Sequence, residues 1–207
     1  MRILLSLALA TSLAGCTSIS IKTIAHSDPS ANFKGKKITL IGITKETTNS
    51  LEFKAYKKLM EELLQANGLI PTDDGPDIVG VLAYDIDNGK SITRSMPIFG
   101  QTGGGSSTTY GNIGGQSFSA NTYQAQRFGV VGTNVSSGTE YMRRLWVNIY
   151  DVDPAKSSAL YELRSSSRGS CEVLPTIVPY LIKSAFSEFP LPSGKQRSES
   201  LSFKDDC

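Results

Sequence analysis

The sequence contains little histidine, tryptophan and cysteine, and its charges almost cancel. Its 207 residues include one histidine, one tryptophan and three cysteines, with 21 basic and 19 acidic side chains. Because His26 is the only imidazole, a histidine-rich metal site is excluded and a catalytic triad has a single candidate base. Nucleic-acid binding depends on basic side chains that neutralise phosphates, so the balanced charge argues against nucleic acid as a partner.

The short motifs of common cofactor and metal sites each lack an essential member. Gly103-Gly104-Gly105 is not followed by the Lys-Ser/Thr of a phosphate-binding loop. Residues 85–89 (DIDNG) look like the start of a calcium loop, but Met96 stands at the twelfth position, where glutamate is needed. The aspartates of residues 73–77 are typical of turns, and the thiol of Cys171 has no histidine close by in the sequence. We therefore expect no catalytic residues, no cofactor and no bound metal.

The apolar stretch at the start of the chain is too short to cross a membrane. It runs from Ile3 to Gly15, whereas a spanning helix needs about 20 apolar residues. A basic residue at the start, Arg2, a short apolar core and small residues before a cleavage site are typical of a secretory signal peptide. We predict that residues 1–15 are removed.

The end of this stretch resembles a known processing site. Leu13-Ala14-Gly15-Cys16 is similar to the lipobox of bacterial lipoproteins. The resemblance implies a diacylglycerol on the sulfur of Cys16, cleavage before this residue and acylation of the new amine with a fatty acid such as palmitate. Two or more acyl chains hold a protein stably on a membrane. Thr17 follows the cysteine in place of an aspartate, which by the same resemblance implies the outer membrane, with the domain facing the periplasm.

The processed chain, residues 16–207, is expected to form one domain with two polar ends. We predict a tether at 16–36, a domain at 37–193 and a polar tail at 194–207. Export places Cys171 and Cys207 where disulfides persist, so these two residues form either a bridge or two free thiols.

Hydrophobic periodicity predicts four strands and two helices in the domain. In chain order these are a strand at 37–44, a helix at 49–68, strands at 78–86, 141–152 and 159–167, and a helix from 176 to 190. The sequence does not decide whether residues 19–24 form a further edge strand. The expected fold is α+β, a mixed four- to five-stranded sheet with two amphipathic helices on one face, in the order β-α-β-β-β-α.

The first helix has clear start and stop signals. Asn49 is the predicted N-cap, with Glu52 three residues later as in a capping box. Gly68 follows the last apolar residue, where a left-handed residue is favoured.

The order of elements also resembles a family of bacterial lipoproteins known only as a domain of unknown function. The resemblance rests on the G-L-I-P at 68–71, the strand ending in tyrosine at 78–84, the glycine-rich insert and the closing Phe189-Pro190. Where that family has Ala-Asp before the strand, this chain has Pro76-Asp77. The resemblance implies no enzymatic activity.

Residues 100–140 form a Gly/Ser/Thr-rich insert. They include ten glycines, six serines, six threonines and three asparagines. Such a composition favours a flexible loop, because little apolar surface offsets the entropy of ordering. The alternative is a long hairpin that pairs with a partner's edge strand or with other copies. Its dispersed apolar and aromatic residues are Tyr110, Phe118, Tyr123, Phe128, Val130 and Val131.

Three functions remain open from the sequence. The first is a non-enzymatic, membrane-anchored lipoprotein that presents its domain to a protein or cell-wall partner. The second is a subunit of an envelope export or surface-assembly complex that oligomerises through residues 100–140. The third is a hydrolase with a cryptic carboxylate site.

Overall fold

The computed structural model describes residues 17–153, 155, 158–203 and 207. Cys16 and the predicted signal peptide lie outside these residues. The described chain divides into two compact units. Unit 1 comprises the described residues up to Gly89 and from Glu140 onward, and unit 2 comprises Lys90–Thr139.

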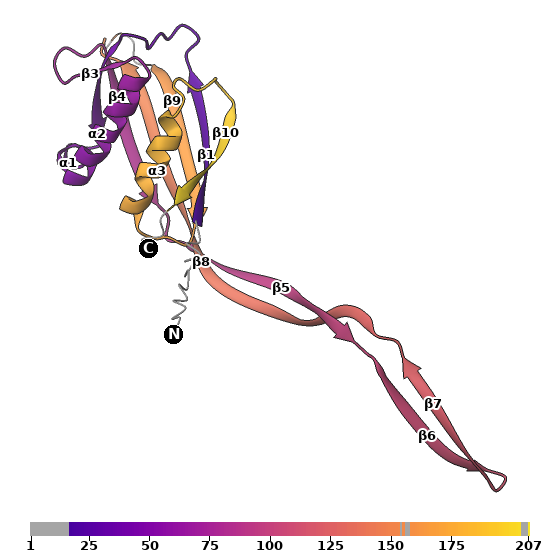
Figure 1. Ribbon diagram of the computed structural model, residues 1–207. Helices are drawn as coiled ribbons and strands as arrows, with labels where there is room; N and C mark the ends of the chain where they lie inside the picture. The colour runs from indigo at the N-terminus through magenta and orange to yellow at the C-terminus, as the bar shows by residue number, and fades with distance from the viewer. Residues whose placement is uncertain (1–16, 154, 156–157, 204–206) are drawn as a thin grey trace, which may run out of the picture. The chain divides into compact units, whose positions relative to one another are not determined.

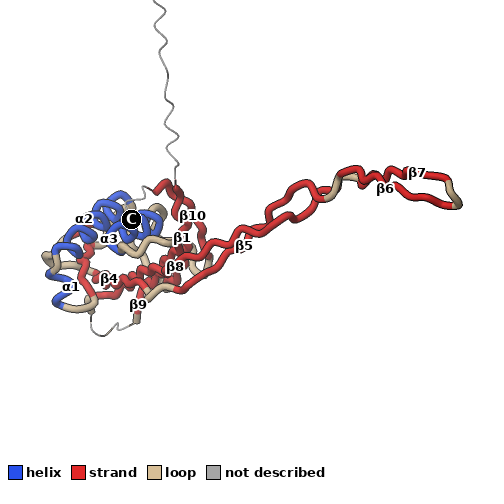
Figure 2. The backbone as a smooth tube through the Cα atoms, turned by 90° about the horizontal axis from the view of Figure 1, so that it is seen from below, coloured by secondary structure: helices blue, strands red, loops and turns tan. Residues whose placement is uncertain are grey.

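Unit 1 is built on one large sheet with helices on one of its faces (Figures 1 and 2). The strand order is β10-β1-β9-β8-β4-β2-β3. β2 pairs in parallel with β3 and β4, and the other neighbours along this order are antiparallel. The strands are β1 (Thr17–Ser27), β2 (Lys37–Gly42), β3 (Ile70–Pro71), β4 (Ile78–Ile86), β8 (Arg127–Asp151), β9 (Ala159–Gly169) and β10 (Gln196–Phe203), and the helices are α1 (Lys45–Asn49), α2 (Leu51–Ala66) and α3 (Leu174–Phe186).

The prediction of a four- to five-stranded sheet is wrong. With β5 (Lys90–Thr102), which pairs with β8, the sheet has eight strands, and strands outweigh helices in the described chain. The expected strands at 78–86 and 159–167 are present as β4 and β9, whereas the strand expected at 141–152 is the end of the much longer β8. The additional strands come mostly from segments whose polar composition suggested a tether, a loop and a tail.

Residues 17–27 of the predicted tether form the strand β1 inside the sheet, and this strand includes the one left open at 19–24. β1 pairs on one side with β10, from Thr17↔Phe203 to Ile24↔Gln196, and on the other side with β9. Its alternation explains the placement, because the side chains at positions 19, 21, 23 and 25 are buried while those at 20, 22 and 24 are not. Sheet structure is therefore present from Thr17, the first residue that the structure describes.

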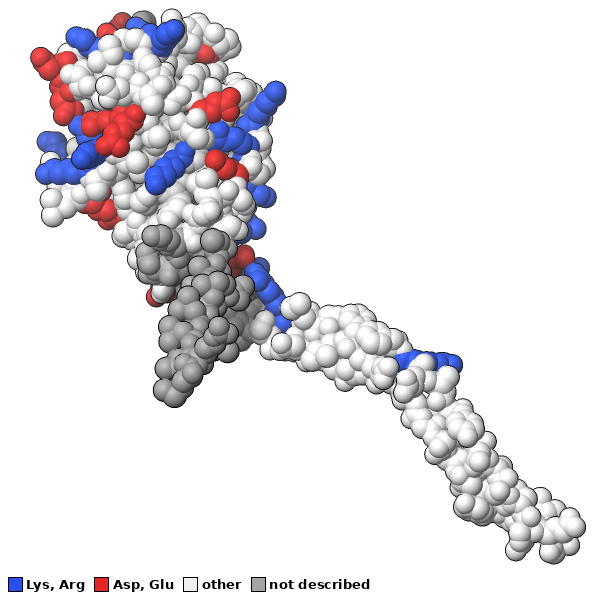
Figure 3. Space-filling model, in the orientation of Figure 1, with Lys and Arg blue, Asp and Glu red and all other residues white. Residues whose placement is uncertain are grey.

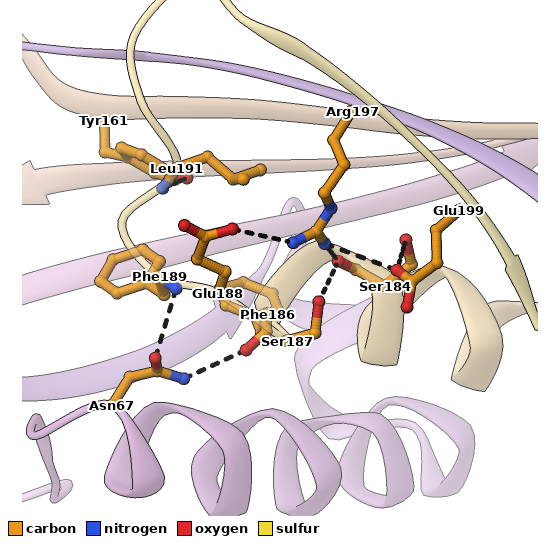
Figure 4. Close-up of polar contacts among 10 residues, drawn as sticks. All are labelled: Asn67, Tyr161, Ser184, Phe186, Ser187, Glu188, Phe189, Leu191, Arg197 and Glu199. Atoms are coloured by element: carbon orange, nitrogen blue, oxygen red, sulfur yellow. Dashed lines mark hydrogen bonds and ion pairs between the residues drawn. The ribbon is translucent and has the colours of Figure 1, made fainter.

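The predicted polar tail is also largely a strand, β10. Its inward-facing Arg197 and Glu199 are polar, and their partners come from α3 and from Glu188, which follows this helix (Figure 4). The Arg197 guanidinium donates to the Ser184 carbonyl and lies 3.6 Å from Glu199 Oε2 and 3.6 Å from Glu188 Oε2. The Ser184 hydroxyl donates to Glu199 Oε2 over 2.9 Å. These contacts give partners to polar groups that the sequence alone marks as solvent-exposed, while the buried Arg197 Nε has no hydrogen-bond partner among the described residues.

Helix α2 starts one residue later than the capping prediction. Ser50, not Asn49, is the N-cap, and its hydroxyl accepts from the Phe53 N–H over 3.0 Å. Glu52 does not close a capping box, since its carboxylate accepts from the Tyr56 hydroxyl over 2.8 Å. Gly68 has φ +88°, which is the left-handed conformation expected after the helix.

The core lies between the helices and the covered face of the sheet. The buried face of α2 consists of Phe53, Tyr56, Met60 and Leu64. The asparagine that ends α2, Asn67, ties this helix to the end of α3. Its amide donates to the Leu63 and Phe186 carbonyls over 2.8 and 3.1 Å, and its carbonyl accepts from the Phe189 N–H over 3.2 Å.

Unit 2 is a long antiparallel hairpin rather than a structureless loop. β5 pairs with the first half of β8, and β6 (Gly105–Ile113) pairs with β7 (Gln116–Gln124) in a separate two-stranded sheet. Gly114 and Gly115, with φ +61° and +85°, form the two-residue turn between β6 and β7, as the mirror-image hairpin turns require.

Candidate functional site

The face of the sheet opposite α2 and α3 carries a band of half-buried apolar side chains. In this band Val81 and Ala83 of β4 stand opposite Asn148 and Trp146 of β8. Asn148 and Trp146 are in turn paired with Glu162 and Arg164 of β9. Together with Ile43 these six residues line a shallow hollow of about 360 Å³. Apolar residues at the centre and charged residues at one side are typical of an interaction surface.

An arginine that is paired with an aspartate lies over the indole of Trp146 on this open face. The Arg144 guanidinium donates two hydrogen bonds to the Asp85 carboxylate, over 2.8 and 3.1 Å. Its Cζ also lies 5.5 Å from the centroid of the Trp146 ring. The hydrogen bond to Asp85 raises the pKa of the Arg144 guanidinium above its ordinary value.

The surface of unit 2 is apolar in many places and almost uncharged. Between residues 95 and 139 the only charged side chain is Arg127. The large side chains are exposed on both faces of the hairpin, with Tyr110, Tyr123 and Phe128 at 79, 78 and 76% exposure. Figure 3 shows the contrast with unit 1, where basic and acidic side chains alternate over the visible face.

A third feature is a buried guanidinium at the end of the sheet where β1 starts. Arg143 is 2% exposed and lines a hollow of about 150 Å³ together with Ser18, Arg168 and Ser170. No motif in the sequence marks this residue. The available signal is a basic side chain at an inward position of the β8 alternation, two residues before Leu145.

Cys171 and Cys207, whose pairing could not be decided from the sequence, form a disulfide in the structure. The Cα atoms of Cys171 and Cys207 lie 5.5 Å apart, with a sequence separation of 36. The bridge connects the segment after β9 with the residue that follows β10 by four positions.

The polar residues considered as ligands have structural partners. His26 is exposed near the end of β1, opposite Glu162. The Asp77 carboxylate accepts from the Lys37 N–H over 2.8 Å, and the Asp87 carboxylate accepts from the Gly89 and Met142 N–H groups. Within the described ranges no group of three or more His, Cys, Asp or Glu side chains is placed to hold a metal ion.

Asp73 joins the turn before β4 to α2, and this contact predicts a small pH effect. Its carboxylate is 2.6 Å from Lys57 Nζ and accepts from the Thr39 hydroxyl over 2.8 Å. The hydrogen bond from Lys57, followed by that from Thr39, lowers the pKa of Asp73 below 3.8. A lowered folded-state pKa stabilises the protein above the unfolded value and loses this effect as the pH falls through the folded value.

We expect Asp73→Asn to lower the free energy of unfolding by less than about 1 kcal/mol at pH 7, because the carboxylate is largely exposed. The loss should disappear below the folded-state pKa. Urea denaturation at pH 7 and pH 3 measures the difference, and Asp74→Asn is the matched control. An equal loss at both pH values would contradict the assignment.

Within the described residues no helix is long and apolar enough to cross a membrane.

No model of a known protein family matches the chain, and no curated protein matches it. Among solved structures, the chain is similar to a PDZ domain protein from Parabacteroides distasonis, with 12% identity and a TM-score of 0.43 over 90% of this chain. The chain spans 40% of the length of that protein. It is also similar to the PelC dodecamer from Paraburkholderia phytofirmans, with 9% identity and a TM-score of 0.39 over 81% of this chain and 95% of that one.

Proposed function

We propose that the chain is a lipid-anchored, non-enzymatic protein of the bacterial envelope that works by association, with unit 2 pairing with unit 2 of other copies. The observation that carries the proposal is the uncharged β6–β7 part of the hairpin, with its free strand edges. β6 and β7 pair only with each other among the described strands, so each presents one edge of unpaired backbone groups.

A hairpin of this kind is expected to have little stability when it is isolated in water. A two-stranded hairpin is marginally stable in water, and free edges favour pairing with another chain unless charges protect them. β6 and β7 contain no charged side chain. Pairing with a neighbouring hairpin would satisfy the edge groups and cover Tyr110 and Tyr123.

Other copies of the chain are the partners that the proposed anchor supplies. Acylation at Cys16 would confine all copies to one membrane plane. Confinement raises their effective concentration, so weak edge contacts become sufficient for association.

The anchor is tested by the intact mass of the protein extracted from membranes. We expect a mass equal to residues 16–207 plus acyl groups, and an unprocessed, non-sedimenting chain from Cys16→Ala. A wild-type mass without acyl groups would contradict the anchor while leaving the hairpin to be tested separately.

Charge on the hairpin edges tests the association. Ser107→Lys with Ser119→Lys places one lysine on each strand of the β6–β7 sheet, and we expect the dissociation constant of the oligomer to rise about tenfold or more, since each 1.4 kcal/mol corresponds to a factor of ten. The measurement is light scattering after size exclusion of the acylated chain in a nonionic detergent.

The matched control is Ser198→Lys with Ser200→Lys on β10, the edge strand of unit 1, which should associate like the wild type. Trp146 is the only tryptophan, so its emission reports on the open face. Association through the hairpin leaves this emission unchanged, whereas association through the open face shifts it to shorter wavelength. A wild type that is monomeric at every concentration would refute the proposal.

A further inference from the structure

Three basic side chains surround Ser166 on the open face of the sheet. Ser166 of β9 pairs with Lys22 of β1, and Arg164 and Arg168 stand two residues before and after it on its own strand. The three basic side chains are exposed, while the alternate positions of both strands are buried against the helices. Since neighbouring strands lie about 4.8 Å apart and alternate residues about 6.6 Å apart, each basic residue has its Cα within about 7 Å of that of Ser166. We call Lys22, Arg164 and Arg168 the Ser166 cluster.

The acidic side chains beside the Ser166 cluster do not neutralise it. The Asp85 carboxylate is held by Arg144, which pairs with Ser166 from the side of β8. Glu162 stands two residues from Arg164 on the same face. Among the described residues, however, no carboxylate lies within ion-pair distance of a member of the cluster. Three like charges this close together favour a partner with several negative charges.

The strands on either side of the cluster fit such a partner. On β1 and β10 the open-face positions from 18 to 24 and from 196 to 202 hold only serine, lysine, isoleucine and glutamine, so no acidic side chain repels an anion there. On the side of β8, Trp146 pairs with Arg164. Tryptophan is enriched where proteins meet lipid headgroups, because its ring is apolar and its N–H is polar.

We propose that the Ser166 cluster docks this part of the open face onto a membrane surface that contains anionic phospholipids. Clusters of lysine and arginine are attracted to anionic headgroups, and guanidinium groups match phosphate oxygens in geometry and charge. The headgroup phosphates would supply the negative charge that the cluster lacks.

The choice of a membrane as the partner rests on the anchor in the proposed function. Lys22 is six residues after Cys16, and a strand rises about 3.3 Å per residue. Acylation at Cys16 would thus hold Lys22 within about 20 Å of the anchoring residue. A tethered surface meets the membrane at a high effective concentration, so a few ionic contacts are sufficient to dock it.

The test is quenching of Trp146 emission by lipids that are brominated on their acyl chains. Trp146 is the only tryptophan and lies beside Arg164, so docking brings its indole to the bilayer surface. The acylated mature chain is placed in vesicles of brominated phosphatidylcholine, with or without phosphatidylglycerol. We expect strong quenching only with phosphatidylglycerol, and we expect it to be lost at high salt, because salt screens the attraction.

Lys22→Gln with Arg168→Gln removes two of the three charges. Since one basic side chain near an anionic surface contributes about fivefold to binding, the ratio of docked to undocked chains should fall about 25-fold. The matched control is Lys54→Gln with Lys58→Gln, which makes the same change of net charge on exposed positions of α2. This control should be quenched like the wild type.

Three results would overturn the proposal: equal quenching in neutral and anionic vesicles, no quenching in either, or wild-type quenching in the Lys22→Gln, Arg168→Gln chain. If vesicles give no quenching but soluble polyglutamate shifts the Trp146 emission, the cluster binds an acidic protein and the lipid proposal fails.

The mass of the same sample reports the anchor independently. A chain without acyl groups that is still quenched in anionic vesicles would refute the anchor and support the cluster. An acylated chain that is not quenched would support the anchor and refute the cluster.

Discussion

Removing the disulfide with Cys207→Ser lowers the free energy of unfolding by about 3–4 kcal/mol. The bridge spans 36 positions, and in the loop-entropy model a ring of this size restricts the unfolded chain by about that amount at 25 °C. Cys207 is exposed, so its replacement changes little besides the cross-link. The measurement is urea denaturation of the oxidised wild type beside the variant.

Two comparisons separate the cross-link from packing. Cys171 is 6% exposed and belongs to the core, so Cys171→Ser should lose slightly more than Cys207→Ser. Wild type treated with a reductant should match Cys207→Ser. If reduction leaves the stability of the wild type unchanged, the bridge does not form in solution.

The same disulfide also bears on the surroundings of the buried Arg143 side chain. Cys171 contributes its carbonyl to Arg143, and its neighbours Gly169 and Ser170 line the hollow. We therefore infer that the bridge restrains the segment that surrounds the guanidinium. This places the restraint, the buried cation and the first residues of β1 at one end of the sheet.

Elements with strong apolar periodicity could be predicted from the sequence. β4 and α2 each bury one regular set of side chains, and their bounds fall close to the predicted ranges. The inward set of α3 also contains the predicted apolar residues from Ile177 to Phe186. In these elements local pattern and tertiary burial agree.

Elements whose inward side chains are polar could not be predicted. The sequence of β10 is typical of a solvent-exposed segment, because Arg197 and Glu199 alternate with serines. Partial burial of these two side chains is favourable only because Ser184 and Glu188 are placed to contact them. Unit 2 lacks apolar density, so its strand pairing depends on glycine turns and backbone hydrogen bonds. The candidate surfaces could not be predicted from the sequence for a related reason. Whether Trp146 is exposed and Arg143 is buried depends on which face of the sheet the helices cover, and the sequence does not show this.

The largest loss of stability is expected at Tyr161, whose side chain joins three segments. Its ring centroid lies 5.7 Å from that of Phe33 and 5.0 Å from that of Phe189, and its hydroxyl accepts from the Leu191 N–H over 3.2 Å. These contacts fix the segment between α3 and β10, so they also position β10 beside β1.

We expect Tyr161→Ala to cost about 3–5 kcal/mol, the range for removing a large buried aromatic side chain. Tyr161→Phe keeps the ring but leaves the Leu191 N–H without its acceptor, and it should cost about 1–3 kcal/mol. Urea denaturation of both variants measures the two losses, and equal losses would show that the ring contacts contribute nothing.

Alkaline titration provides an independent check of the same side chain. Burial raises the pKa of Tyr161 to about 12 from its ordinary value of 10. Because the folded state holds the proton more tightly, stability is retained below pH 10 and declines as the pH rises toward 12. Tyr161→Phe lacks this group, so its stability should fall less steeply over the same interval, and parallel curves for the two proteins would mean that Tyr161 is not buried as described.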